Sequence, residues 1–305
     1  MRRLGYWPSL FCCEDMTMII QKKMEQIIHG IFLLLGLITV GCVLLITVYL
    51  VISGIPAIRE IGLVDFLFGK EWASTADEPK YGILSFILTS IYGTFGAILI
   101  GVPVGFMTAV YLSKLASPTV KSVMQSAVSL LAGIPSVVYG LVGMLVLVPG
   151  IRKIFNVPDG ASLLAAIIVL AIMILPSIIK MSITALDAVP KEYEDASLAL
   201  GATPIETYFK VSVPAAKSGI AAAVVLGVGR AIGEAMAVMM VAGNVPNMPD
   251  SLFQSVRFLT TAVASEMSYS SGLQRQALFS IALVLFLFIM LINAMLNFFL
   301  KREKE

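Results

Sequence analysis

Two ionisable residues four positions apart, Arg230 and Glu234, have the types and spacing that could do chemistry in this chain. They lie inside an apolar stretch that predicts a membrane-spanning helix over residues 215–243. A charge at the bilayer centre costs about 2.5–3.5 kcal/mol on insertion scales, so Arg230 needs a partner or a function. In a helix this spacing puts Glu234 one turn from Arg230 on the same face. The pair could neutralise itself, or Arg230 could meet an anion in transit.

The anion interpretation has a specific chemistry. An arginine fork matches the oxygens of a tetrahedral oxyanion. A carboxylate beside it, here that of Glu234, could accept a hydrogen bond from a protonated anion. Near neutral pH phosphate still carries a proton, whereas sulfate carries none. We therefore expect the pair formed by Arg230 and Glu234 to favour phosphate and to repel sulfate.

The composition is that of a membrane protein. Of 305 residues, 58% are hydrophobic and 13% are charged, and the mean hydropathy is +0.94. Soluble domains are about half apolar and a quarter charged. Apolar runs of about 20 residues are typical of spanning helices, and the runs here are too long for barrel strands. The sequence therefore predicts an all-α polytopic membrane protein with about six transmembrane helices, over residues 27–52, 84–112, 123–148, 162–183, 215–243 and 277–300.

Glycines and prolines interrupt the middle helices. Pro103 and Pro176 are expected inside two of them. Residues 101–105 and 229–233 each have two glycines at the spacing that allows helices to approach closely. Gly133-Ile134-Pro135-Ser136 is expected in mid-membrane, where a proline frees backbone groups that need partners or a lined cavity. A broken helix beside a pathway and a packing kink are equally good interpretations of this segment.

Lysine and arginine residues indicate the orientation. Their excess in alternate connections places both termini and the loop over residues 187–214 in the cytoplasm. On the outside lie residues 59–80, where Trp72 is interpreted as an aromatic anchor at the membrane boundary. Residues 244–276 form a longer outside loop, a candidate gate or dock for an external partner. The regions expected are a cytoplasmic tail over 1–26, a membrane domain over 27–300 and a cytoplasmic tail over 301–305.

The loop over residues 187–214 carries a series of helix start and stop signals. Pro190 suits the first position of a helix, because its missing N–H would be unpaired there. Gly201 can take the left-handed conformation that ends helices. Thr203-Pro204-Ile205-Glu206 supplies the hydroxyl, proline and carboxylate of a capping box. These signals predict a compact cytoplasmic helix–turn–helix between two membrane segments.

This loop resembles the one that marks permeases of ATP-binding-cassette importers, which reads Glu-Ala-Ala, three residues, Gly, nine residues, then Ile-x-Leu-Pro. The spacing is complete and the substitutions are mild; the matching residues are Asp195-Ala196-Ser197, Gly201, Val211, Val213 and Pro214. In that family the loop is the coupling helix that docks on the ATPase subunit. The resemblance implies that the residues coupled to the ATPase are Glu194, Asp195, Ala196, Ser197, Gly201, Ala202 and Pro214.

A second resemblance is to the PstC-type permeases of phosphate importers. It runs from about residue 72 to residue 299 and rests on Tyr81-Gly82, on residues 131–140 and on Gly229-Arg230-Ala231-Ile232-Gly233-Glu234-Ala235-Met236-Ala237-Val238. The Thr-Ala-Pro that typically follows in sister PstA-type permeases is absent. The resemblance implies that phosphate passes Arg230 and Glu234. It also implies an ATPase dimer that binds ATP, a PstA-type sister permease and an external phosphate-binding protein, all at the cytoplasmic (inner) membrane.

Residues for other kinds of chemistry are missing. The phosphate cradle Gly-x-x-x-x-Gly-Lys-Ser/Thr is absent, since Gly69-Lys70 is followed by Glu71. The chain is therefore expected to be no enzyme and to bind no cofactor of its own. No spacing typical of metal ligands or of a catalytic centre is present, and the three cysteines imply no disulfide framework. The formal charge of +2 indicates no nucleic-acid partner, whereas membrane lipid is expected around the helices.

Three alternatives stay open. The same machine could carry another oxyanion, such as sulfate, thiosulfate or molybdate. An ion-coupled secondary transporter would need proton- or sodium-binding residues in the membrane, where Glu234 is the one carboxylate that we expect. A membrane enzyme would need a catalytic constellation, which the sequence does not contain.

Overall fold

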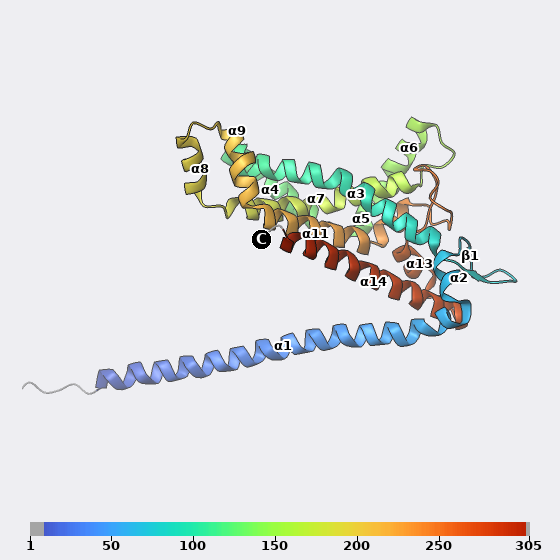
Figure 1. Cartoon of the computed structure of the whole chain (residues 1–305), viewed down its shortest axis with the longest axis horizontal. Helices are drawn as coiled ribbons and strands as arrows, with labels where there is room; N and C mark the ends of the chain where they lie inside the picture. Colours follow the sequence, from blue (N-terminus) through green and yellow to red (C-terminus); the bar gives the residue numbers. More distant parts are fainter. Residues whose placement is uncertain (1–8, 303–305) are drawn as a thin grey trace, which may run out of the picture. The chain divides into compact units, whose positions relative to one another are not determined.

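The computed structural model describes the backbone of residues 9–302 and the side chains of residues 24–295 and Phe298. Most of that backbone is helical (Figure 1), which confirms the all-α prediction. The predicted tails are only partly covered. Residues 1–8 and 303–305 lie outside the described residues, whereas residues 9–26 are helical.

The chain divides into two compact units, Met1–Ile52 and Ser53–Glu305. Helix α1 (Ser9–Ile61) begins in the first unit and ends in the second. Helices α8 (Lys191–Ala199) and α9 (Pro204–Thr207) lie together at one end of the second unit (Figure 1). We call this the loop end, because it holds the predicted cytoplasmic loop.

Five helices of the described residues are long and apolar enough to cross a membrane. They are Met24–Ile61, Leu84–Leu115, Ser136–Phe155, Leu163–Asp187 and Gly272–Met295. A sixth is reached if the bent pair Pro204–Ala215 and Lys217–Gly233 counts as one span. This agrees with the predicted number of about six. Four spans lie where the sequence predicts them, and the third and fifth differ.

Helix α7 (Leu163–Asp187) forms the centre of the second unit. Helices α3 (Leu84–Val110) and α11 (Lys217–Gly233) pack against it. Most of the residues of α7 are buried, including large side chains on all sides, as expected for a helix that is apolar all round. Pro103 and Pro176 lie inside α3 and α7 without ending them, as predicted.

Glycines set the distance between α3 and α7. A Cβ atom on Gly101 would lie 2.6 Å from Cδ1 of Ile174, and one on Gly105 would lie 2.9 Å from Cγ2 of Ile178. Any side chain at these two positions would push the helices apart, so the predicted close approach is confirmed. A Cβ atom on Gly229 or Gly233 would meet nothing within 4 Å among the described residues, so a close approach at residues 229–233 stays a prediction.

The third predicted span, residues 123–148, is wrong because the chain breaks within it. Helix α4 (Pro118–Gly133) ends before Ile134, whose φ of −70° and ψ of 127° are extended. Pro135 has no N–H to donate and forces the preceding residue out of the helical region. The helix is therefore broken at this point and not merely kinked, whereas the pathway beside the break stays a prediction. The span begins after the break and consists of α5 (Ser136–Val142), the π-helical turn η2 (Gly143–Leu147) and α6 (Val148–Phe155).

The fifth predicted span, residues 215–243, is also broken. Helix α11 ends at Gly233, and Glu234 has an extended backbone with φ of −74° and ψ of 128°. Helix α12 (Met236–Val241) then begins, and the N–H of Ala237 in its first turn donates to Oε1 of Glu234 at 3.1 Å. The glutamate side chain thus caps the new helix in place of continuing the old one.

The opposite end of the second unit, which we call the hairpin end, is built from short elements (Figure 1). Helix α2 (Leu63–Phe68) leads into the antiparallel strands β1 (Trp72–Ala73) and β2 (Lys80–Tyr81). These pack with α13 (Leu259–Glu266) and the start of α14 (Gly272–Arg302) in one apolar cluster. The predicted outside connections 59–80 and 244–276 therefore meet at the same place.

Trp72 lies in the core of the hairpin end. It is 6% exposed, its ring packs against those of Tyr81 at 5.5 Å and Phe86 at 5.6 Å between centroids, and its Nε1 donates to the carboxylate of Glu266. The interpretation of Trp72 as a membrane-boundary anchor is therefore wrong. An indole is usually buried where its N–H finds an acceptor, and Glu266 provides one.

Candidate functional site

The predicted turn chemistry of the 187–214 loop is confirmed. Pro190 is the N-cap of α8, one position before the one predicted, and Gly201 ends that helix with a φ of 89°, which glycine adopts without strain. The capping box is complete. The N–H of Thr203 donates to Oε2 of Glu206 at 3.1 Å, and the N–H of Glu206 donates to Oγ1 of Thr203 at 3.3 Å. The loop is thus a well-defined helix–turn–helix.

A bend connects this loop to the membrane helix that follows. Helix α9 continues through the π-helical turn η3 (Tyr208–Ser212) into α10 (Val213–Ala215), so Pro214 lies inside a helical segment. That segment and α11 meet at an angle of 71°. The hydroxyls of Ser197 and Thr207 lie 2.9 Å apart and tie α8 to the segment. The two helices of the loop are therefore joined by a side-chain hydrogen bond as well as by the chain, and form one piece.

The predicted coupling residues of this helix–turn–helix differ in how far they are exposed to solvent. Those exposed are Asp195, Ala196, Gly201 and Pro214, and those partly covered are Glu194, Ser197 and Ala202. Three large apolar side chains beside them are also exposed: Leu200 at 90%, Ile205 at 61% and Tyr193 at 56%. Solvent-exposed apolar groups on a capped helix–turn–helix are typical of a contact surface for another protein.

Glu194 points from α8 toward the membrane helices. Its Oε1 accepts hydrogen bonds from Nζ of Lys114 at 2.6 Å and from Oγ of Ser212 at 2.8 Å. Burial raises the pKa of the Glu194 carboxyl, but the hydrogen bonds from Lys114 and Ser212 and the charges of Lys114 and Lys191 hold the pKa below its usual value. The carboxylate is therefore charged, mostly covered and bound from two sides.

A second acidic residue ties the end of α7 to the same region. Asp187 accepts from Oγ of Ser113 at 2.6 Å and from Nζ of Lys121 at 3.0 Å. Ser113 and Lys114 both belong to the π-helical turn η1 (Tyr111–Leu115), which continues α3. Sequence reasoning missed these bonds, because the partners are 66 to 80 residues apart and no local pattern pairs them.

Arg230 and Glu234 are not on one helix face, so the predicted one-turn relationship is wrong. Helix α11 ends at Gly233, between them, and Oε1 of Glu234 is bound to the N–H of Ala237. Both side chains are half-buried. No ion pair of the described side chains includes Arg230. Its guanidinium is therefore not neutralised by Glu234 here.

The two helix breaks lie close together. Helices α5 and α12, which follow them, approach so closely that a Cβ atom on Gly140 would lie 2.9 Å from Cα of Ala237. The hydroxyl of Tyr139 donates to the carbonyl of Leu131 at 2.7 Å and so bridges the first break. Tyr139 is also within electrostatic reach of Arg230. Arg230, which forms no ion pair among the described side chains, thus precedes the second break and acts electrostatically on Tyr139, which bridges the first.

A polar cluster that sequence reasoning missed lies at the hairpin end. The carboxylate of Glu266, at the end of α13, forms an ion pair with Arg257 and accepts hydrogen bonds from Trp72, Ser74 and Gln274. The side chains of Arg257 and Glu266 are 15% and 21% exposed. A negative charge is unfavourable at a helix C-terminus, and Arg257 compensates for it.

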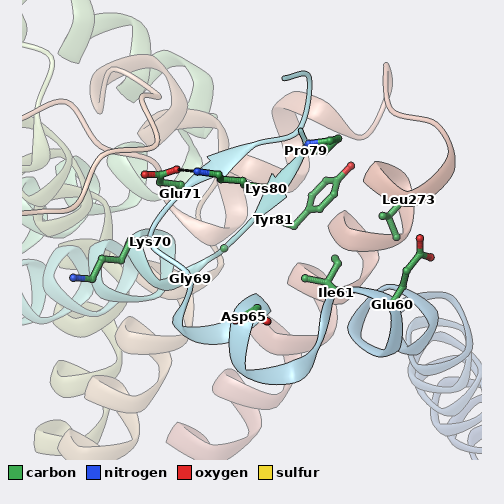
Figure 2. Close-up of a pocket in the computed structure, with 11 residues that line it drawn as sticks. Glu60, Ile61, Asp65, Gly69, Lys70, Glu71, Pro79, Lys80, Tyr81 and Leu273 are labelled. Atoms are coloured by element: carbon green, nitrogen blue, oxygen red, sulfur yellow. Dashed lines mark hydrogen bonds and ion pairs between the residues drawn. The ribbon is translucent and has the colours of Figure 1, made fainter. Parts of the chain in front are cut away.

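A cavity of about 610 Å³ also opens at the hairpin end. Its lining includes Glu60 and Leu273 and the exposed ion pair Lys80–Glu71 at 2.6 Å, which Figure 2 shows beside Tyr81. The hydrogen bond and charge of Lys80 hold the pKa of the Glu71 carboxyl below its usual value. None of the predicted site residues lines this cavity.

Comparison with known proteins gives a consistent result. The family model described as "Binding-protein-dependent transport system inner membrane component" matches residues 101–305. The "Probable ABC transporter permease protein YqgH" of Bacillus subtilis (strain 168) is 41% identical over 266 residues, 85% of this chain and 86% of that protein. The "Phosphate transport system permease protein PstC" of Pasteurella multocida (strain Pm70) is 34% identical over 241 residues, 73% of this chain and 75% of that protein.

Solved structures agree on the fold. Inward-facing conformations of the MetNI methionine ABC transporter match with a TM-score of 0.54 and 21% identity, over 72% of this chain and 94% of that one. An amino acid ABC transporter crystallised with histidines matches with a TM-score of 0.52 and 22% identity, over 72% and 92%. At this identity the likeness shows the fold alone.

Proposed function

The chain belongs to the family of binding-protein-dependent transport system inner membrane components, and we propose that it is the PstC-type permease subunit of an ATP-driven importer of inorganic phosphate. The observation that carries the proposal is the similarity, over about three quarters of the chain, to permeases named for phosphate transport. The family consists of multi-pass inner-membrane proteins, which act in transport and not in catalysis.

Phosphate passes beside Arg230 in this proposal. The guanidinium offers charge and a fork of N–H donors, and no carboxylate of the described residues occupies it. Glu234 stands at the α11–α12 break. Its carboxylate accepts a hydrogen bond from the P–OH group of phosphate and repels an unprotonated dianion such as sulfate. The neighbouring break at Pro135 exposes further backbone groups toward the path.

Permeases of this family work with an ATPase and a substrate-binding protein. In the proposal an ATPase dimer binds ATP, and the chain itself binds no cofactor. The dimer docks on the exposed surface of the 187–214 loop, which lies in the cytoplasm with both termini. A PstA-type sister permease completes the path, and an external phosphate-binding protein delivers phosphate at the hairpin end. The membrane domain over residues 27–300 is surrounded by lipid and lies between cytoplasmic tails over residues 1–26 and 301–305. The proposal includes no nucleic-acid partner.

Reconstitution of the complete transporter in vesicles tests this function. The ATPase, the sister permease and the external binding protein are included, and phosphate uptake is measured with and without ATP. We expect ATP-dependent uptake that Arg230→Gln abolishes while the amount of assembled complex stays normal. ATP-dependent uptake of sulfate, thiosulfate or molybdate in place of phosphate would identify another oxyanion. Uptake that continues without ATP and collapses with an uncoupler would identify a secondary transporter.

A further inference from the structure

The carboxylate of Glu194 joins two π-helical turns that are remote in the sequence. Lys114 belongs to η1 and Ser212 to η3. Both donate to the same atom, Oε1 of Glu194, at 2.6 and 2.8 Å. Turns of this kind inside α-helices are less regular than their surroundings and are frequent at functional sites. Helix α8 is therefore held at the two places where the adjoining helices depart from α-helical geometry.

We call the contact of Glu194 with Lys114 and Ser212 the joint. The ion pair of Lys114 and Glu194 in it is shielded from water. The side chains of Lys114 and Glu194 are 11% and 17% exposed. By contrast, Lys210 and Glu206 on the same loop are 74% and 48% exposed. Separation of a covered pair leaves two uncompensated charges in a poorly solvated place, whereas an exposed pair separates at little cost. A displacement of α8 is therefore transmitted to Lys114 and not absorbed by breaking the bond.

The joint leads to two membrane helices. Ser212 precedes α10 and α11, and the latter ends beside Glu234. Lys114 follows α3, which is pressed against the central helix α7 at Gly101 and Gly105. A push along the chain alone would reach α11 only through the 71° bend, where a change of angle can absorb it. The contact with Lys114 avoids that bend.

We propose that Glu194 is a positioning residue that transmits the ATPase-driven movement of α8 to α3 through Lys114, in parallel with the covalent route to α11. This inference rests on the proposed function, since the movement comes from the ATPase. Helices α3 and α11, which both pack against α7, then move together when the loop moves. Loss of the Lys114 contact leaves α3 behind, so ATP is hydrolysed without the full change of access that transport needs.

The ratio of phosphate imported to ATP hydrolysed tests the inference in the complete reconstituted transporter. We expect Lys114→Gln to lower this ratio about tenfold, within the usual range for coupling between sites, while ATP hydrolysis continues. Lys210→Gln is the matched control, because it removes the cation of an exposed ion pair on the same loop, and it should leave the ratio unchanged. An unchanged ratio in Lys114→Gln would overturn the inference.

Charge reversal separates coupling from folding. Lys114→Glu and Glu194→Lys should each lower the ratio, since each places like charges together. The double variant restores an ion pair of reversed sense and should recover most of it. Equal loss in the single and double variants would overturn the inference. A wild-type complex that hydrolyses ATP but imports another oxyanion would contradict the proposed substrate, and the ratio measured with that oxyanion would still test the joint.

Discussion

Oγ1 of Thr260 donates a 2.8 Å hydrogen bond to the backbone carbonyl of Glu234. Thr260 lies in the first turn of α13, where the neighbouring N–H of Leu259 donates to Oγ of Ser90 on α3 at 3.0 Å. The carbonyl freed by the α11–α12 break is thus satisfied by a helix whose far end carries Glu266. Helix α13 therefore contacts the break beside Arg230 with its first turn and carries the cluster at the hairpin end at its last residue.

The first prediction concerns this bond. Thr260→Val keeps the shape of the side chain but removes the hydroxyl, so the carbonyl of Glu234 loses its partner. We expect the free energy of unfolding in detergent to fall by about 1 kcal/mol, the usual value of a neutral hydrogen bond. Ser265→Ala is the control, because among the described residues the Ser265 hydroxyl bonds to the carbonyl of Ala262 in its own helix and not to another element. Equal stability of the Thr260 variant and wild type would show that the bond does not hold the break.

The second prediction concerns selectivity. Glu234→Gln removes the negative charge but keeps a side chain that can accept from the N–H of Ala237. We expect competition by sulfate for phosphate uptake to become measurable, since the repulsion of an unprotonated dianion is lost. The measurement is phosphate uptake by the reconstituted transporter at increasing sulfate. Sulfate inhibition identical to that of wild type would remove Glu234 from the proposed path.

Local signals explain why much of the loop end could be predicted. Gly201 and the Thr203–Glu206 capping box act within a few residues of chain, so their types and spacing determine their geometry. The extended backbone before Pro135 follows for the same reason. Apolar runs likewise predicted four spans at their places, because their length matches the thickness of a bilayer.

The break at Glu234 could not be predicted in this way. No proline stands there, and Gly233 alone does not mark a break, because the sequence stays apolar on both sides of Gly233-Glu234. The break is stabilised by Thr260, which is 26 residues further on, and by the contact of α12 with α5. The burial of Trp72 depends in the same way on Glu266, which is 194 residues away. Both the break at Glu234 and the burial of Trp72 are therefore determined by tertiary contacts and not by local sequence.

The third prediction concerns the cluster at the hairpin end. Glu266→Gln leaves the covered guanidinium of Arg257 without a counter-charge. Breaking a buried ion pair costs several kcal/mol, and since these side chains are partly exposed we expect a loss of about 2 kcal/mol in the free energy of unfolding. Glu71→Gln is the matched control, because the side chains of its pair with Lys80 are exposed, and its unfolding transition should coincide with that of wild type. A Glu266 variant as stable as the Glu71 variant would contradict the role of the cluster.

The last prediction uses the lowered pKa of Glu194. A carboxyl whose pKa is lower in the folded protein than in the unfolded chain, where its ordinary value is 4.5, stabilises the fold above that value. This contribution is lost as the pH falls through the folded-state pKa, because the protonated carboxyl no longer attracts Lys114. We expect the stability of the wild type in detergent to decrease more steeply below pH 4.5 than that of Glu194→Gln, which has no proton to bind there. Parallel stability curves for the two proteins between neutral pH and the acid limit would show that Lys114 and Ser212 do not hold the carboxylate in its charged form.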